Sequence, residues 1–167
     1  MSPPQSLQNP NELNEVAPAL LLYARSLGTS GPRDAHDLVQ EAIVRILAAE
    51  QHPLDARAWL FRTVRNLAFS AARREHVERR CADHHVFRDD RLGSLDTERL
   101  AAAIGALDPQ AREIVVLKVW AELTFDQIAS VVSVPAPTAH RRFREALLLL
   151  REKMDPSCNK ATTKTTT

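Results

Sequence analysis

The sequence predicts an all-α protein made of two small helical domains joined by a linker, with a helix-turn-helix in the second domain. The 167 residues contain only four glycines beside many Ala, Leu, Arg and Glu, a composition that favours helix. Apolar residues recur at helical spacing in several capped segments, and no alternating strand pattern is present. Between residues 84 and 96 this spacing is lost and acidic residues collect, which indicates a linker.

These patterns divide the chain into five parts. We expect a disordered N-terminus over 1–10, a helical domain over 11–83, a linker over 84–98, a helix-turn-helix domain over 99–154, and a disordered tail over 155–167. The tail ends in the low-complexity run NKATTKTTT, whose composition cannot supply a packed core.

Two helices are expected to open the first domain. The first covers about 14–27, with Pro18 in its opening turn and Gly28 as its stop. The second is capped by Asp34 and runs to about Ala49. Its apolar residues recur at helical spacing and predict its buried face: Leu38, Ala42, Ile46 and Ala49.

A third helix follows the break at Pro53. Asp55 can cap it, and it runs to about Arg80. We expect the aromatic residues Trp59 and Phe61 to be part of the core, because most aromatic side chains beside an apolar stripe are buried. That stripe consists of Leu60, Val64, Leu67 and Ala71.

The second domain is expected to open its first capped helix at Asp108, with Pro109 at the first helical position. Residues 124–127, TFDQ, have the form of a capping box. Behind them Ile128, Ala129 and Val132 supply a core stripe, and residues 133–135 make a turn. This unit has the pattern of a helix-turn-helix.

The last helix is amphipathic. Arg141 and Arg144 point away from its apolar face, with His140 at the flank. The face expected to be buried consists of Ala139, Phe143, Ala146, Leu147 and Leu150. A basic outer face of this kind suits a helix that reads the major groove of DNA, although such helix pairs also occur as plain packing units.

Charge is segregated along the chain, although the net charge is only +1. Residues 1–55 sum to −4 and residues 56–80 to +5, while 81–107 and 108–134 each sum to −2 and 135–167 return to +4. Two basic blocks among acidic ones indicate contacts with phosphates at two places and with protein elsewhere.

Composition and motifs also exclude several classes of protein. The two cysteines lie 77 residues apart, which is no disulfide framework and favours a reducing compartment. The N-terminal stretch lacks a signal sequence, and no apolar run approaches the ~18 residues of a membrane span. We therefore expect a cytoplasmic protein without membrane insertion. Because no nucleophile elbow or phosphate loop occurs, we expect neither an enzyme nor a cofactor.

One cluster of metal-ligating residue types lies near the expected linker. His76, Cys81, His84 and His85 fall within ten residues, and a thiolate with imidazoles suits zinc or iron. Their spacing matches no ligand pattern, so we expect no metal site.

Three motifs give the chain a family resemblance: DAHDLVQEAIVRIL at 34–47, RAWLFRTVRNLAFSAARRE at 57–75, and the segment 107–147 that contains the helix-turn-helix. In this order and spacing they resemble the two domains of the extracytoplasmic-function sigma factors, bacterial subunits that direct RNA polymerase to promoters. The resemblance covers about residues 11–154. The short stretch between Ala49 and Trp59, with the sequence PLDARAWL at 53–60, is more similar to the iron-starvation subgroup.

The resemblance implies a polymerase contact on the second helix. Asp37, Gln40 and Glu41 are spaced i, i+3 and i+4, so they form one polar and acidic patch. In similar sigma factors this patch docks on a coiled coil of core RNA polymerase. Without the resemblance it would be read as a solvated helix face.

The resemblance also implies two promoter contacts. On the third helix, the Asn66 amide captures an unpaired base of the minus-ten element, an aromatic ring supports stacking and arginines hold phosphates. The residues expected here are Arg62, Arg65, Asn66, Phe69, Arg73 and Arg74. On the last helix, the residues expected to contact the minus-thirty-five region are Thr138, His140, Arg141, Arg142 and Arg144.

The second domain departs from the family pattern. The family usually has glycine at the position of Ser133, a serine cap at the position of Pro135 and a further basic residue near Leu147 or Leu148. The missing cap costs about 1 kcal/mol of helix stability, while Pro137 is tolerated in a first helical turn.

Two alternatives therefore stay open beside a sigma factor that binds core polymerase, promoter DNA and an anti-sigma factor. One is a sigma-like decoy or regulatory protein without productive initiation. The other is a helix-turn-helix repressor, which leaves the acidic patch at 37–41 and the surface around Asn66 unused.

Overall fold

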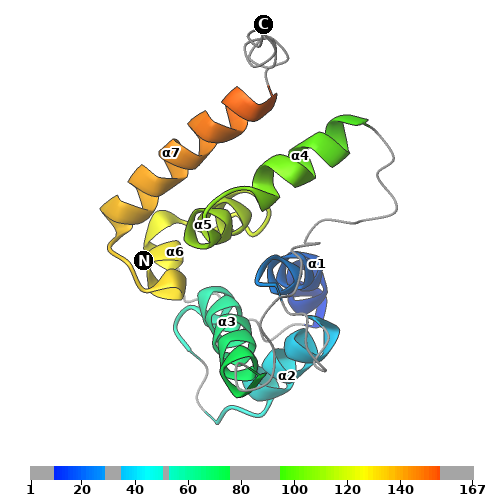
Figure 1. The fold of residues 1–167 in the computed structure, drawn as a ribbon. Coiled ribbons are helices and arrows are strands. Elements are labelled where there is room, and N and C mark those ends of the chain that lie inside the picture. The colour runs from blue at the N-terminus through cyan, green and yellow to red at the C-terminus, as the bar shows by residue number, and fades with distance from the viewer. Residues whose placement is uncertain (1–9, 29–34, 51–52, 76–94, 155–167) are drawn as a thin grey trace, which may run out of the picture.

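We describe the fold from a computed structural model, in which residues 10–28, 35–50, 53–75 and 95–154 are described, except for the side chains of 10, 11, 71–75 and 95–98. Every regular element in these ranges is an α-helix, so the predicted all-α class is confirmed. In Figure 1 the helices before residue 76 form a first lobe, and the helices after residue 94 form a second lobe beside it. The first lobe consists of α1 (Pro10–Ser26), α2 (Ala35–Leu47) and α3 (Ala56–Glu75), and the second of α4 (Leu95–Gly105), α5 (Pro109–Val119), α6 (Phe125–Val132) and α7 (Ala136–Met154).

Helix α1 begins earlier than the sequence predicts. It starts at Pro10, and Glu12 stands in its first turn, where a carboxylate favours the helix dipole. Pro18 lies inside the helix, so its predicted place in the opening turn is wrong. Its side chain is exposed, and the missing N–H leaves the carbonyl of Asn14 without its helical hydrogen bond. Gly28 follows the helix with φ of +70°, as expected of a helix stop.

Helices α2 and α3 form at the predicted places, although α2 ends at Leu47 where the sequence predicts an end near Ala49. The predicted cap of α2, Asp34, and the predicted end of α3 near Arg80 lie outside the described residues. The Asp55 carboxylate accepts a hydrogen bond from the backbone N–H of Ala58 at 2.9 Å and caps α3. Phe61 is fully buried, and Trp59 packs partly buried against the core. The predicted stripes are buried at Leu38, Ala42, Ile46, Leu60, Val64 and Leu67, whereas Ala49 is partly exposed and the side chain of Ala71 lies outside the described ones.

Helix α4 starts at Leu95, inside the stretch expected to be linker. The buried guanidinium of Arg112 holds its end, donating to the carbonyl of Ile104 at 3.2 Å, to that of Leu107 at 3.1 Å and to that of Gly105. A cation at a helix C-terminus also offsets the helix dipole. Burial lowers the pKa of Arg112 from its ordinary value. Helix α4 is thus held by a tertiary contact, which its local sequence does not reveal.

The helix-turn-helix of α6 and α7 forms as predicted. Asp108 caps α5 ahead of Pro109. At the start of α6 both bonds of the capping box are present, from Gln127 N–H to the Thr124 hydroxyl at 3.2 Å and from Thr124 N–H to the Gln127 side chain at 2.8 Å. Ile128 and Val132 are buried, while Ala129 is partly exposed. Ser133 ends α6 in the left-handed region with φ of 58°.

The buried face of α7 is narrower than predicted. Ala139, Ala146 and Leu150 are buried and Phe143 is half-buried, but Leu147 is 43% exposed. Its predicted burial is wrong because successive residues are turned by about 100° around the helix, which places Leu147 beyond the edge of a stripe centred on Ala146.

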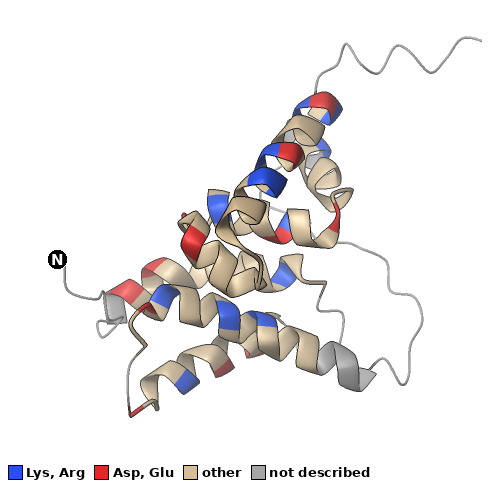
Figure 2. Cartoon of the chain, turned by 90° about the vertical axis from the view of Figure 1, so that its left-hand side faces the viewer, with Lys and Arg blue, Asp and Glu red and all other residues tan. Residues whose placement is uncertain are grey.

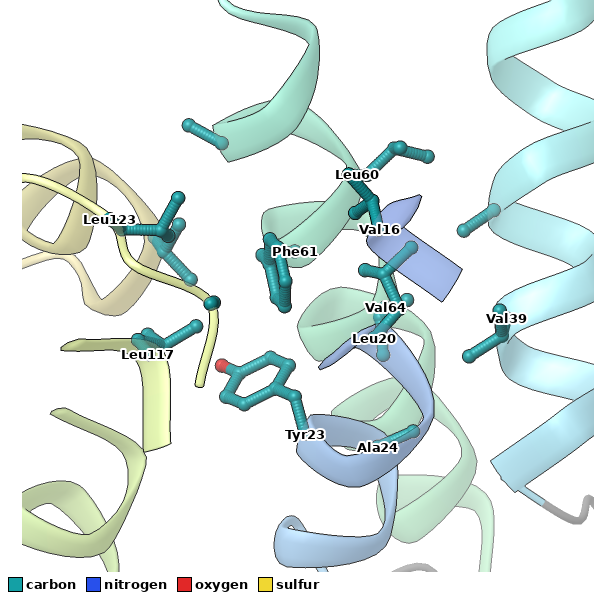
Figure 3. Packing of buried hydrophobic residues seen from close by; sticks show 14 of the residues in the cluster. Val16, Leu20, Tyr23, Ala24, Val39, Leu60, Phe61, Val64, Leu117 and Leu123 are labelled. Carbon is teal, nitrogen blue, oxygen red and sulfur yellow. The ribbon is translucent and has the colours of Figure 1, made fainter. Parts of the chain in front are cut away.

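The two lobes share one apolar core. Tyr23, Phe61 and Val64 of the first lobe belong to the same buried cluster as Leu117 and Leu123 of the second, and Figure 3 shows these side chains around the ring of Tyr23. Helix α1 contacts α5, and α3 contacts α6. A smaller cluster joins α4, α5 and α7. The lobes therefore pack against each other in this arrangement.

Candidate nucleic-acid interface

The acidic patch predicted on α2 lies at the surface. Asp37 and Gln40 are exposed, and the Glu41 carboxylate, which is 32% exposed, accepts a hydrogen bond from Arg45 at 2.6 Å. The opposite side of α2 is buried against α1 and α3. All three predicted residues therefore share the outer side of α2, in a position to meet a partner protein.

The surface predicted on α3 is partly open and partly covered. Arg62 and Asn66 are exposed, and Phe69 is 39% exposed. The guanidinium of Arg65 stands over the ring of Phe69 at 4.6 Å from its centroid, a cation–π contact. Figure 2 shows the basic residues spaced along this helix. Arg73 and Arg74 follow on the same helix, but their side chains lie outside the described ones.

Arg65 is bound to the second lobe. Its Nε donates to Oε2 of Glu113 on α5 at 2.8 Å, and the two side chains are only 20% and 6% exposed. The Tyr23 hydroxyl of α1 donates to the same oxygen at 3.4 Å. Helices α1, α3 and α5 thus meet at one buried carboxylate. We call Tyr23, Arg65 and Glu113 together the Glu113 cluster.

Burial dominates the electrostatics of the Glu113 cluster. Desolvation raises the pKa of Glu113, although the guanidinium of Arg65 and the hydroxyl of Tyr23 oppose the shift. The pKa of Tyr23 is raised well above its ordinary value, first by burial and then by the carboxylate of Glu113. The phenol therefore stays neutral and acts as a hydrogen-bond donor, and Arg65 is the cation that offsets the buried carboxylate.

A hollow lies between α3 and α6. Trp59 and Arg62 line it from the first lobe, and Asp126 and Ser130 from the second. A second predicted promoter residue, Arg62, therefore also faces the second lobe. Two predicted promoter arginines of α3 stand at the contact between the lobes.

The basic residues predicted on α7 occupy its first half. His140, Arg141 and Arg144 are exposed, whereas Thr138 and Arg142 are half-buried. The His140 ring meets Phe125 edge-on at 4.8 Å. Arg141 pairs with Glu145 at 3.5 Å, a contact between exposed groups that contributes little. Farther along, Leu147, Leu148 and Leu149 are exposed, so the basic surface ends in an apolar one.

Neither a metal site nor a membrane-spanning helix is found among the residues that the structure describes. Among them, no group of three His, Cys, Asp or Glu side chains could hold a metal ion. No helix there combines the length and apolar character needed to cross a membrane. The cluster of His76, Cys81, His84 and His85 lies outside the described residues.

Comparison with known proteins matches both lobes. Residues 13–77 match sigma-70 region 2, and residues 97–150 match sigma-70 region 4. An RNA polymerase sigma-E factor of Streptomyces avermitilis is 29% identical over 143 residues, covering 82% of this chain and 79% of the relative. An ECF RNA polymerase sigma factor, EcfG, of Rhodopseudomonas palustris is 28% identical over 144 residues, covering 81% and 79%.

Two solved structures also resemble this chain in fold. The sigma factor RpoE in complex with the anti-sigma factor NepR, from Bartonella quintana, superposes with a TM-score of 0.69 at 26% identity, covering 86% of this chain and 94% of that one. CnrH in complex with the cytosolic domain of CnrY gives a TM-score of 0.60 at 26% identity, covering 84% and 83%.

A region 2 lobe and a region 4 lobe on one short chain define a sigma subunit of bacterial RNA polymerase. The chain belongs to the extracytoplasmic-function group of the sigma-70 family. Its function is to direct promoter recognition and transcription initiation, and its partners are core RNA polymerase and promoter DNA. The comparisons do not favour a decoy over a sigma factor.

Sequence reasoning missed Glu113 and Tyr23. Glu113 is the second residue of the motif REIVVLKVW, where it precedes four apolar residues. A run of four apolar residues leaves a helix little surface that faces water, so a carboxylate beside it could have suggested a buried ion pair. Nothing in the local sequence indicates that its partner is Arg65, 48 residues away.

Proposed function

We propose that three surfaces of this sigma factor divide the work of initiation. The acidic patch on α2 docks on core polymerase, the exposed face of α3 captures an unpaired base of the minus-ten element, and the first half of α7 reads the minus-thirty-five region. The polymerase performs the chemistry, and the sigma factor positions the DNA.

One observation carries the role of α3. Its outward residues include a basic side chain, a carboxamide and an aromatic ring, at Arg62, Asn66 and Phe69. A base leaving the duplex needs stacking, contacts to its edge and neutralised phosphates. Arg62, Asn66 and Phe69 together offer these three kinds of contact on one helix.

The proposed roles on α7 depend on its two faces. Ala139 and Ala146 hold one face in the core, so Arg141 and Arg144 project from the other. Thr138 and Arg142 flank this surface, and His140 stands at its rim because its ring packs on Phe125. A helix presenting basic residues near its N-terminus fits the major groove.

We also propose that an anti-sigma factor regulates this protein. One of the similar structures is a sigma factor bound to an anti-sigma factor, and the exposed Leu147, Leu148 and Leu149 offer apolar area of the kind that marks protein contacts. We place the protein in the cytoplasm, where RNA polymerase works. Assignment to the iron-starvation subgroup stays a prediction from the stretch 49–59.

Charge reversal on α2 tests the docking surface. With Asp37→Arg and Glu41→Arg together, we expect association with purified core polymerase to be lost in a pull-down while helix content by circular dichroism stays unchanged. Glu15→Arg and Glu152→Arg, two exposed acidic positions on α1 and α7, form the matched control and should bind normally. Wild-type binding by the Asp37 and Glu41 variant would refute the proposed dock.

A further inference from the structure

We propose that His140 takes up a proton when α7 binds DNA, so that its imidazolium holds a phosphate at the edge of the groove and promoter binding tightens as pH falls. This inference rests on the proposed function, because it requires that the first half of α7 contact the minus-thirty-five region. It adds a chemical control to that contact. The arginines beside His140 cannot supply this control, because a guanidinium stays charged at every physiological pH.

His140 stands where the basic surface of α7 meets α6. It lies in the second turn of α7 and is exposed, while Ala139 beside it is buried in the core. Arg141 and Arg144 project from the same half of the helix. A helix whose first half enters the major groove brings residues at its rim close to the phosphates that border the groove. His140 is therefore in a position to contact the DNA backbone.

A contact with Phe125 fixes the direction of the imidazole ring. The two rings meet edge-on, with centroids 4.8 Å apart and an angle of 86° between their planes. Phe125 is itself held by Phe143, whose ring also meets it edge-on with centroids 5.7 Å apart. Aromatic pairs prefer this geometry. The imidazole is thus presented at a defined place beside the arginines.

Cations stand around the paired rings. Lys118 of α5 lies over the ring of Phe125, with its Nζ 4.9 Å from the centroid. Arg144 follows His140 at the i+4 position, where two side chains of a helix are neighbours. The second cation of α5, Arg112, is turned to the carbonyls at the end of α4. A positive charge on the imidazole would therefore be placed among like charges.

The carboxylates of α5, α6 and the first half of α7 are directed elsewhere. On α5, Glu113 is bound by Arg65. Asp126, the carboxylate of α6, lines the hollow towards α3. On α7 itself, Glu145 pairs with Arg141 at 3.5 Å. The counterion of an imidazolium at this position must therefore come from a bound partner.

DNA supplies the anion that the surroundings of His140 lack. An opposite charge within about 4–6 Å favours the charged form of a titratable group, and histidine is the side chain whose charge changes between about pH 5 and 8. Binding therefore takes up a proton, and by linkage the affinity rises as pH falls. At alkaline pH the neutral imidazole loses the phosphate contact, while the arginines keep theirs.

The test measures binding of the holoenzyme to a promoter duplex on which it starts transcription. Core polymerase has a pH dependence of its own, so the wild type is compared with His140→Gln at each pH. A contact that shifts a pKa by one unit changes affinity tenfold between the two protonation states. We therefore expect the ratio of wild-type to variant affinity to be about fivefold larger at about pH 6 than at about pH 8.5.

Salt dependence gives a readout that a packing role would not change. The imidazolium neutralises one more phosphate, so the slope of log affinity against log salt should be steeper by up to about 0.9 at the lower pH in the wild type, but not in His140→Gln. His140→Arg keeps a permanent cation and should bind tightly at both pH values. As a control, His36→Gln removes an exposed histidine of α2 and should keep the wild-type pH dependence.

The outcomes separate the proton uptake from the proposed function. Equal pH dependence of the wild type and His140→Gln would overturn the proton uptake. So would an equal loss of affinity in His140→Gln and His140→Arg at both pH values, since the ring would then only pack on Phe125. If the wild-type holoenzyme binds without protecting upstream DNA at either pH, the proposed reading role of α7 fails. Upstream protection with equal pH dependence would refute the proton uptake alone.

Discussion

At Ser133 the turn of the helix-turn-helix needs a left-handed backbone, with φ of 58°. A side chain in this region crowds its own carbonyl, which costs roughly 1–2 kcal/mol, while glycine avoids the clash at the expense of a more flexible unfolded chain. The structure thus explains why the family pattern has glycine here, and the serine is a local weakness that the capping box and core of α6 tolerate.

Ser133→Gly should therefore stabilise the protein, by ~0.5–1 kcal/mol, since it relieves the positive φ. Urea unfolding measures the change. Ser130→Gly is the matched control, because Ser130 is exposed inside α6, and there glycine should destabilise the protein by roughly 0.5 kcal/mol. Destabilisation by both substitutions would contradict the account of the turn.

Replacement of Asn66 tests whether its amide captures an unpaired base. If its amide holds an unpaired base, Asn66→Ala should slow open-complex formation on duplex promoters and leave binding to unrelated duplex DNA nearly unchanged. Permanganate footprinting reports the open complex, and filter binding reports the duplex. Equal losses in both assays would indicate that Asn66 has no special role in base capture.

At the scale of elements, sequence reasoning succeeds where structure is local. The caps at Asp55, Asp108 and Thr124 and the buried stripe of α2 depend on neighbours within one or two turns, so spacing reveals them. Sequence patterns do not predict features that depend on contacts between residues far apart in the chain. Helix α4 depends on the Arg112 guanidinium, and the Glu113 cluster joins residues from three helices.

The same distinction applies to the candidate sites. Periodicity alone places Asn66 on an exposed side of α3 and Arg141 on an exposed side of α7. Periodicity cannot tell that Arg65, one residue before Asn66, turns towards another lobe. It also assigns Leu147 to the core, because the width of a buried stripe depends on which helices cover it.

Helix α7 gives a prediction of its own. Arg141→Ala should cost ~1–3 kcal/mol of promoter binding and relax specificity at one upstream position if Arg141 contacts a base edge. A phosphate contact would instead weaken all sequences about equally and reduce the salt dependence. Footprinting at two salt concentrations separates the two contacts. No upstream protection in the wild type, with polymerase binding intact, would refute a reading role for α7.

On the scale of the whole molecule, the protein is two lobes held together by a shared core and a buried carboxylate. Asp37 and Gln40 of the first lobe are exposed, whereas the side chain of Arg65 on α3 is largely covered by the second lobe. The patch that we propose for polymerase is therefore open in this arrangement, while part of the surface that we propose for promoter DNA is not.

Stability should depend on pH through Glu113. Because the pKa of Glu113 is raised in the folded protein, the folded state binds this proton more tightly than the unfolded chain does. The stabilising contribution is complete below the ordinary carboxyl range near pH 4 and is lost as pH rises through the raised value. Around the carboxylate stand Arg65, Tyr23 and, at the start of α5, Asp108.

Removing Arg65 should enlarge this effect. Arg65→Met takes away the cation that lowers the pKa of Glu113, so the free energy of unfolding should fall more steeply between mild acid and neutral pH than in the wild type. The double variant with Glu113→Gln should lack this pH dependence. A free energy of unfolding of Arg65→Met that does not vary with pH would show that Glu113 is not a buried, destabilising charge in this variant.

Run-off transcription with purified core polymerase on a library of genomic promoter fragments would show whether this protein is a working sigma factor. We expect defined transcripts that require this protein, with start sites at a fixed distance from shared minus-ten and minus-thirty-five sequences. They should disappear with the Asp37 and Glu41 double reversal. Binding to core polymerase without any specific transcript would contradict a role in initiation and identify a sigma-like decoy.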